Sequence, residues 1–250
     1  MVEAAGGMFE GAFVSCGQLK ELMANEDISL KLFDSSFAHC GPDVATSKEN
    51  FKKEAIVGAK CIPMEMIHVE GAKFPFTFPS KPHFIATMKA LSIRKSDIVV
   101  LYGQPPMVAI VGASRVWFML NKFGHKNAYI LDGNLSQWKE EGGKTEAGGE
   151  PGPSEPGDYD YDIDFSFNLN LEQISHFVEE GDTNKILLDA RPLPAFEKPP
   201  KEGRSLGKMP NAIHVNPAKL MKPNNVHKSP EEIKEYLTGL GNNHSQNNTN

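Results

Sequence analysis

Residues 185–191 read Lys185-Ile186-Leu187-Leu188-Asp189-Ala190-Arg191, a short apolar run that ends in a carboxylate and a guanidinium. Such a run is typical of a strand buried in a parallel sheet, here with an Asp at the end of the strand. A similar run occurs earlier, at Leu30-Lys31-Leu32-Phe33-Asp34. Asp34 and Asp189 lie 155 positions apart, and the downstream pair Ala59 and Ala212 lie 153 apart. That period is the size of a whole domain, so the pattern predicts a duplicated α/β unit.

The composition is that of an ordinary globular protein. The chain has 250 residues, of which 40% are apolar and 23% are charged, and its formal net charge is −6. An acidic chain lacks the basic stripe that nucleic acids require, and it is not attracted to an anionic membrane. No apolar run approaches the roughly 18 residues that span a bilayer. We therefore expect no nucleic-acid partner and no transmembrane segment.

The chain has three cysteines, Cys16, Cys40 and Cys61. They are odd in number, far apart and without a CxxC pair, which favours a reducing compartment over a disulfide framework or a metal pair. The first residues lack the apolar region of a secretory signal, so the protein is not expected to be secreted.

Apolar periodicity predicts strands that alternate with helices. Ser15 and Ser80 are expected helix N-caps, and Gly124 is an expected C-cap. This alternation predicts an α/β fold with a parallel sheet flanked by helices. The predicted strands of the first copy are 28–33, 56–62, 97–102 and 127–131, and its helices follow Ser15 and cover 80–91, 113–123 and 135–141.

A segment rich in Pro and Phe, residues 70–82, separates two of these elements. Proline removes a donor from a strand ladder, so the segment is predicted to lie at the surface and to cover an edge of the core. A recognition role for its phenylalanines is the alternative.

Residues 142–157 are rich in Gly, Pro and Glu and lack an apolar period, which predicts a linker. Residues 158–164 alternate acidic and apolar side chains, and we interpret them as an extended connection. A calcium loop is disfavoured because Ile163 stands where Gly is needed and Leu169 where Glu is needed. The predicted organisation is a complete domain over 8–147, a linker over 148–165 and a partial domain over 166–250, with no metal site.

The second copy is shorter than the first. It has predicted helices at 171–180 and 230–240 and predicted strands at 186–188 and 212–215. In the first helix Leu171, Ile174, Phe177 and Val178 are expected to face inward. Matching helix 80–91 to helix 230–240 places the counterpart of strand 98–102 at residue 247, inside the polar tail 242–250. The second copy is therefore expected to lack its central strand and to expose apolar faces that a protein partner covers.

An ordered set of short motifs runs through both copies. In the first copy they are Phe13-Val14-Ser15, residues 32–37, Ile56-Val57-Gly58-Ala59, Phe123-Gly124-His125, and Leu131-Asp132-Gly133 followed by Trp138. In the second they are Leu188-Asp189-Ala190-Arg191, Phe196, Arg204 and Met209-Pro210-Asn211-Ala212. The set resembles the tandem rhodaneses, the family of thiosulfate and 3-mercaptopyruvate sulfurtransferases. The resemblance covers nearly the whole chain, and it implies no metal or organic cofactor and a mitochondrial or cytoplasmic location.

The resemblance also implies that the catalytic cysteine belongs in the second domain, in the loop after the central strand. Its thiolate would lie in a ring of backbone N–H groups, which lowers the pKa. The second copy stops before that loop, and the first has Gly103 after Tyr102. Cys16 falls on a helix and Cys40 in a loop, while Cys61 is expected to be a buried, inert thiol. No catalytic residue is predicted.

Arg204 is the one predicted substrate-binding residue, because it matches in spacing a family arginine that binds the substrate anion. The alternative is a surface cation in a lysine-rich loop. Ala195 stands where the family often has another arginine. Arg191 is interpreted as a structural ion pair with a loop carboxylate, and Asp34 and Asp189 as turn residues that accept backbone N–H bonds.

Two functions of different classes follow from these observations. The first is an enzyme, a thiosulfate or 3-mercaptopyruvate sulfurtransferase of the rhodanese family, of which these 250 residues are an incomplete piece. Residues 1–250 taken alone are predicted to be inactive, as a pseudoenzyme is, because the nucleophilic cysteine is absent. The second is a non-catalytic accessory subunit of a larger, mitochondrial assembly. A third class, a binding module for a small anion or a phosphopeptide, rests on Arg204 alone.

Overall fold

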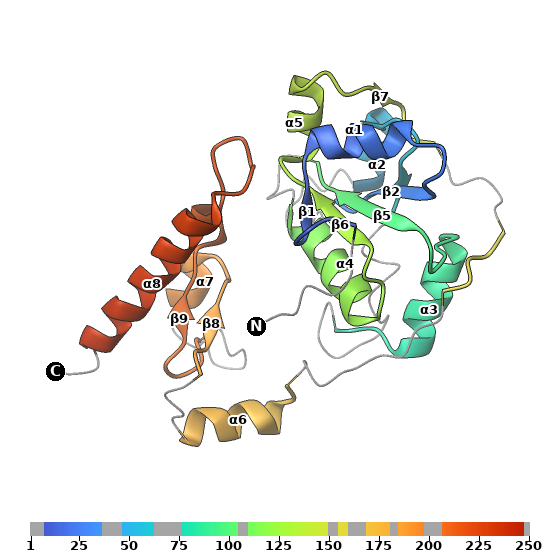
Figure 1. Ribbon diagram of the computed structural model, residues 1–250. Helices are drawn as coiled ribbons and strands as arrows, with labels where there is room; N and C mark the ends of the chain where they lie inside the picture. The colour runs from blue at the N-terminus through green and yellow to red at the C-terminus, as the bar shows by residue number, and fades with distance from the viewer. Residues whose placement is uncertain are drawn as a thin grey trace. The chain divides into compact units, whose positions relative to one another are not determined.

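The computed structural model describes residues 8–36, 47–62, 77–104, 110–149, 155–159, 169–180, 185–197 and 207–247. The chain divides into two compact units, unit 1 (Met1–Phe165) and unit 2 (Ser166–Asn250) (Figure 1). Cys40, Arg204 and most of the Pro/Phe segment lie outside the described residues.

Unit 1 has a parallel five-stranded sheet, as the alternation of strands and helices predicted. The strand order is β1-β6-β5-β2-β4, and every neighbouring pair is parallel. The bounds of these strands are β1 Phe13–Val14, β2 Leu30–Asp34, β4 Lys60–Cys61, β5 Ile98–Tyr102 and β6 Ala128–Leu131. All five residues of β5 are buried, because helices cover both faces of the sheet.

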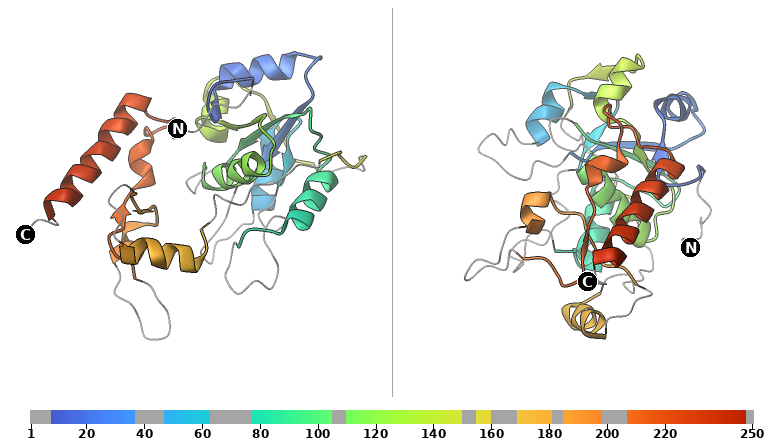
Figure 2. Two further views of the ribbon diagram at one scale, coloured as in Figure 1. Left: turned by 60° about the horizontal axis from the view of Figure 1, so that its bottom comes forward. Right: turned by 90° about the vertical axis from the view of Figure 1, so that its left-hand side faces the viewer.

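Helices cover the two faces of this sheet in pairs (Figures 1 and 2). On one face α3 (Lys81–Ala90) and α4 (Ile110–Lys122) pack against Phe33, Val99 and Leu101. On the other face α1 (Cys16–Ala24) and α5 (Asn134–Glu140) pack against Leu32 and Val100. A further short helix is α2 (Ser47–Lys53).

The helix ends that were predicted from the capping residues Ser15, Ser80 and Gly124 are confirmed. The Ser15 hydroxyl accepts a hydrogen bond from Gln18 N, and the Gln18 side chain accepts one from Ser15 N, which forms a complete capping box. The Ser80 hydroxyl accepts from His83 N at the start of α3, with a proline in the first turn. Gly124 follows α4 with φ +93°, the left-handed conformation that favours glycine at a helix end.

The predicted strand 56–62 is wrong as a single element. Residues Ala55–Ile56 form β3, which pairs antiparallel with β7 (Thr145–Glu146), and β4 pairs with β2 in the main sheet. Between them Gly58 takes φ +78°, and Ala59 N donates to Ile56 O across the turn. Because Gly58 adopts the left-handed backbone conformation, the chain turns at this residue. The single apolar run therefore contributes β3 to one sheet and β4 to another.

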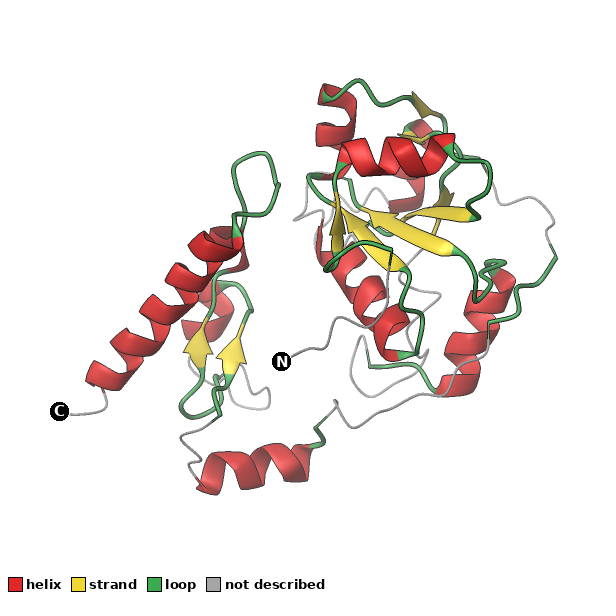
Figure 3. Cartoon of the chain, viewed as in Figure 1, coloured by secondary structure: helices red, strands yellow, loops and turns green. Residues whose placement is uncertain are grey.

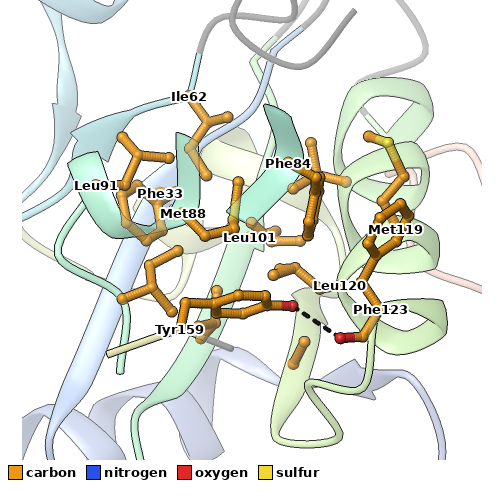
Figure 4. Close-up of a cluster of buried hydrophobic side chains, with 14 of the residues drawn as sticks. Phe33, Ile62, Phe84, Met88, Leu91, Leu101, Met119, Leu120, Phe123 and Tyr159 are labelled. Carbon is orange, nitrogen blue, oxygen red and sulfur yellow. Dashed lines mark hydrogen bonds between the residues drawn. The ribbon is translucent and has the colours of Figure 1, made fainter. Parts of the chain in front are cut away.

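Residues 155–159, which fall within the predicted linker, pack onto unit 1. The Tyr159 side chain is fully buried in the α3/α4 core, and its hydroxyl donates to Phe123 O at 3.3 Å (Figure 4). Its ring stacks on His125 at 5.8 Å between centroids and meets Phe84 edge-on at 5.9 Å. Gly157 N donates to Lys89 O, and Asp158 accepts from Lys95 N. This segment therefore contributes to the core of unit 1.

Unit 2 has a two-stranded parallel sheet, drawn side by side in Figure 3. Its elements are α6 Leu171–Glu180, β8 Leu188–Asp189, α7 Leu193–Glu197, β9 Ile213–His214, the 3₁₀ helix η2 Pro217–Leu220, and α8 Pro230–Asn247. α8 continues into the predicted polar tail. Its start has a capping box in which Ser229 accepts from Glu232 N and Glu232 accepts from Ser229 N.

Unit 2 buries few side chains. Only Asp189, Ala212 and Val215 are buried among its described residues. Of the four residues of α6 predicted to face inward, Ile174, Phe177 and Val178 are half-buried and are the least exposed of the helix. The prediction is wrong for Leu171, which is 83% exposed, and no residue of α6 is fully buried. The predicted exposure of the apolar run before Asp189 is confirmed by Ile186 and Leu188, and that of α8 by Leu237.

No helix in the described part of the chain is long and apolar enough to cross a membrane.

Gly157 tests the packing of segment 155–159. A Cβ at this position would overlap the carbonyl oxygen of Ile93, whereas a Cβ at Gly149 meets nothing within 4 Å. We expect Gly157→Ala to lower the free energy of unfolding of unit 1 by about 1–3 kcal/mol, as overpacking does. The control Gly149→Ala should change it by less than about 0.5 kcal/mol.

Urea unfolding followed by tryptophan fluorescence measures unit 1 directly, because both tryptophans, Trp117 and Trp138, belong to it. Equal midpoints for the two variants would show that segment 155–159 does not stabilise unit 1.

Candidate functional site

The topology of unit 1 locates the site. The chain runs outward from β2 to β4 on one side and from β5 to β6 on the other, so the strand order reverses between β2 and β5. In open α/β sheets, ligands bind at the carboxyl ends of the strands at such a switch point. The residues there are Asp34-Ser35-Ser36 after β2 and Gly103-Gln104 after β5.

These residues form a buried hydrogen-bonded network. Asp34 accepts from Ser36 N at 2.9 Å and from the Gln104 side-chain amide. Gln104 N in turn donates to the Ser36 hydroxyl at 2.7 Å, and the amide also donates to Glu54 O at 2.8 Å. Burial raises the pKa of Asp34, and the hydrogen bonds from Ser36 and Gln104 partly oppose that rise. The network holds the two loops together through a carboxylate.

The structure describes two cysteines of the first unit, Cys16 and Cys61. Cys16 is buried in α1, and burial raises the pKa of its thiol to about 12, so it is protonated at neutral pH. Cys61 is half-buried at the end of β4, in register with Asp34 on β2.

The corresponding edge of unit 2 has a different electrostatic character. Asp189 ends β8 and accepts from Arg191 N at 3.0 Å, as Asp34 accepts from Ser36 N. The Arg191 guanidinium donates to both carboxylate oxygens and also to Gly207 O at 2.9 Å. These bonds lower the pKa of Asp189 and raise that of Arg191. In unit 1 the second carboxylate oxygen of Asp34 instead accepts a hydrogen bond from the Gln104 side-chain amide.

Aromatic and cationic side chains gather beside this ion pair. The Phe196 and His214 rings lie 5.0 Å apart, and the Lys208 ammonium lies 4.6 Å from the Phe196 ring. His214 Nε2 lies 2.9 Å from Arg191 O. This cluster is made of Arg191, Phe196, Lys208 and His214, and the Arg191 charge in it is paired with Asp189.

The roles predicted for Asp34, Asp189 and Arg191 are confirmed. Each carboxylate accepts a backbone N–H two residues on, and Arg191 forms an ion pair, although its partner is Asp189 itself and not another loop carboxylate. Arg204 lies outside the described residues, so its role stays a prediction. The prediction that Cys61 is buried is wrong, since it is half-buried. Sequence reasoning missed Gln104, although its position after a strand end was a usable signal.

Two features therefore define the class of protein: a doubly wound α/β domain, and a partial repeat in which the same strand-end Asp recurs. The rhodanese-like domain model matches residues 15–141. The chain belongs to this family.

Two sulfurtransferases of known activity are similar over most of the chain. The 3-mercaptopyruvate sulfurtransferase of Rattus norvegicus is 27% identical over 234 residues, which cover 90% of this chain and 76% of the relative. The thiosulfate sulfurtransferase of Gallus gallus is 25% identical over 210 residues, which cover 83% of this chain and 70% of the relative.

Solved structures share the fold. The 3-mercaptopyruvate sulfurtransferase SseA of Escherichia coli superposes with a TM-score of 0.79 at 20% identity, over 92% of this chain and 83% of that one. A sub-stoichiometric sulfur transferase subunit of yeast mitochondrial complex I gives a TM-score of 0.73 at 23% identity, over 92% of this chain and 80% of that one.

The Asp189–Arg191 pair is testable by titration. Replacing Arg191 removes the interaction that most lowers the pKa of Asp189, so we expect that pKa to rise in Arg191→Ala. Because a depressed carboxyl pKa gives stability that is present above the unfolded value of 3.8 and lost as pH falls through the folded pKa, the variant should be less stable than the parent chain at neutral pH, and the difference should shrink as pH falls into the acid range.

Side-chain carboxyl resonances followed by NMR against pH measure this shift. Lys208→Ala is the matched control, since it removes a nearby cation that does not bond Asp189. An unchanged Asp189 titration in Arg191→Ala would contradict the assignment.

Proposed function

We propose that residues 1–250 form a rhodanese-family, sulfurtransferase-like protein that does not itself transfer sulfur. The family reaction needs a thiolate that accepts sulfane sulfur from a donor and passes it to an acceptor. The observation behind the proposal is the residue type at the switch point. The loop after β5 begins Gly103-Gln104-Pro105, so no cysteine directly follows the strand there, and burial raises the pKa of the Cys16 thiol to about 12.

The donor classes follow from the relatives. One relative is a 3-mercaptopyruvate sulfurtransferase and the other a thiosulfate sulfurtransferase, and both donors are anions. The cluster of Arg191, Lys208 and His214 in unit 2 supports anion binding there, with Arg204 as a further proposed ligand. Binding of the anion without transfer of its sulfur is the behaviour that we propose for this site.

A non-catalytic accessory subunit is the second candidate, and one observation favours it. Seven of the ten large apolar side chains that are most exposed in the described residues belong to unit 2: Leu169, Leu171, Ile186, Leu188, Leu193, Met209 and Leu237. Exposed apolar side chains in this number favour a protein–protein contact in unit 2. The yeast structural neighbour is a subunit of mitochondrial complex I, which makes a mitochondrial assembly the partner to test first.

The catalytic proposal is tested by incubating the purified chain with thiosulfate, or with 3-mercaptopyruvate, in the presence of cyanide. We expect no thiocyanate above the rate without protein, while the rat relative assayed alongside should give turnover. Turnover would contradict the proposal. A variant with Cys16, Cys40 and Cys61 all replaced would then show whether any of these thiols is the nucleophile.

The accessory proposal is tested by native purification of the chain from its own cells. We expect it to elute with a larger assembly and to leave that assembly when Ile186 and Leu188 are both replaced by Lys. The control pair Met8→Lys and Met23→Lys changes exposed apolar residues of unit 1 and should leave the assembly intact. A free monomer in every fraction would contradict the accessory role.

A further inference from the structure

Segment 155–159 covers a buried histidine of unit 1. The His125 ring follows the end of α4 and is fully buried, and the Tyr159 ring stacks on it at 5.8 Å between centroids with an angle of 13° between the planes. Tyr159 is fully buried as well, although Asp158 before it is exposed. One face of the imidazole is therefore shielded from water by a side chain of this segment.

The segment is held on unit 1 by hydrogen bonds to groups in helix ends and loops. The bonds run from Gly157 N to Lys89 O at 2.9 Å, from Lys95 N to Asp158 Oδ1 at 2.8 Å, and from Tyr159 OH to Phe123 O at 3.3 Å (Figure 4). None of these groups belongs to the five-stranded sheet. A short segment of this kind can open locally while the sheet stays folded.

The His125 imidazole is neutral at neutral pH while the segment covers it. Its Nε2 lies 3.0 Å from Asp97 O, which can only accept, so this nitrogen carries a proton. Burial lowers the pKa of His125 below the ordinary value of 6.5, because a charged ring loses its hydration in the core. The bond to Asp97 O and the charge of Asp97 raise this pKa, but by less than burial lowers it.

The charged groups around this imidazole do not offset its burial. The ends of the elements around the ring carry these ionisable side chains: Lys89 in α3, Lys122 in α4, Arg94, Lys95 and Asp97 in the turn before β5, Lys126 next in the chain, and Glu155, Asp158 and Tyr159 in the segment. Among the described residues, Asp97 is the one whose charge changes the pKa of His125. The Lys126 ammonium instead donates to Asn121 O. Adding a proton to the covered ring therefore costs free energy that is recovered when water reaches the ring.

We infer that segment 155–159 is a pH-sensitive strap, which is docked on unit 1 at neutral pH and is released when His125 takes up a proton. Because covering the ring disfavours its protonation, protonation must disfavour the covered state by the same factor. Docking is therefore strongest above 6.5, the ordinary pKa of the exposed imidazole, and weakens as the pH falls below that value.

Release of the strap changes how the chain leaves unit 1. The strap lies near the carboxyl end of this unit, before the chain passes to unit 2. Its release lengthens the part of the chain before unit 2 that the core of unit 1 does not hold. This switch goes beyond the catalytic and accessory roles proposed above and depends on neither of them.

Amide hydrogen exchange in the full chain tests the strap. The Gly157 amide, which donates to Lys89 O, reports its release, and the Gly148 amide, which donates to Phe51 O at 3.0 Å, is the control. Exchange is followed by NMR at about pH 7.5 and about pH 5, on either side of the ordinary histidine pKa, and each rate is divided by that of an unstructured peptide at the same pH. We expect the protection of Gly157 to fall at least about fivefold at the lower pH, while that of Gly148 changes less than about twofold.

Two variants separate His125 from the other ionisable groups. In His125→Gln the side-chain amide can still donate to Asp97 O but does not titrate, so the protection of Gly157 should lose its pH dependence. Asp158→Asn keeps an oxygen that can accept from Lys95 N and removes the carboxylate of the strap, so the pH dependence should persist.

The titration of the His125 ring, followed by NMR, gives a reading that does not require the glutamine variant to fold. Tyr159→Ala removes the ring that covers the imidazole. We expect the pKa of His125 to move in this variant from its lowered value toward 6.5.

Protection of Gly157 that is the same at both pH values would overturn the inference. An equal loss of protection at Gly148 would also overturn it, because it would show a general weakening of unit 1 in acid. A pH dependence that remains in His125→Gln would assign the proton to another group. A His125 pKa that is unchanged in Tyr159→Ala would show that the strap does not control the charge of the ring.

Discussion

The pairing of β2 with β5 is the interaction on which unit 1 depends. It joins the two strands at the point where the strand order reverses, and it buries Phe33 on one face and Leu32 on the other. It also brings Gln104 to Asp34, so the loops at the carboxyl edge are held by side chains as well as by the ladder. Parallel strands need both faces and both edges covered, and unit 1 meets that requirement at β2.

Unit 2 repeats half of this arrangement. Its β8–β9 pair has the register of β2–β4, and its strand-end Asp makes the same turn, but the described residues provide nothing equivalent to β5. The consequence for packing is the exposure of Leu188 and Ile186. The consequence for chemistry is that the cationic cluster near Arg191 has no described thiol beside it.

Much of unit 1 was predictable because its signals are local. The apolar run 97–102 and the caps Ser15 and Ser80 determine their elements through neighbouring residues, and the structure confirms them. The errors concern features that depend on distant residues. Gly58 divides the run 56–62 because Ala55–Ile56 pairs with Thr145–Glu146 far along the chain. Tyr159, in the segment interpreted as an extended connection, is buried because it packs against side chains of α3 and α4. Leu171 of α6 is exposed, against the prediction, because the described part of unit 2 has only a small core.

Amide hydrogen exchange in the free chain compares the two copies of the strand most directly. Phe33 lies on a strand paired along both edges, so its amide should exchange only when unit 1 unfolds. The amide of Leu188, at the equivalent position, should exchange orders of magnitude faster, while that of Val215, which bonds Asp189 O, should be slower than Leu188. Protection of Leu188 equal to that of Phe33 in a monomeric chain would show that the edge of β8 is already paired, and it would contradict the account.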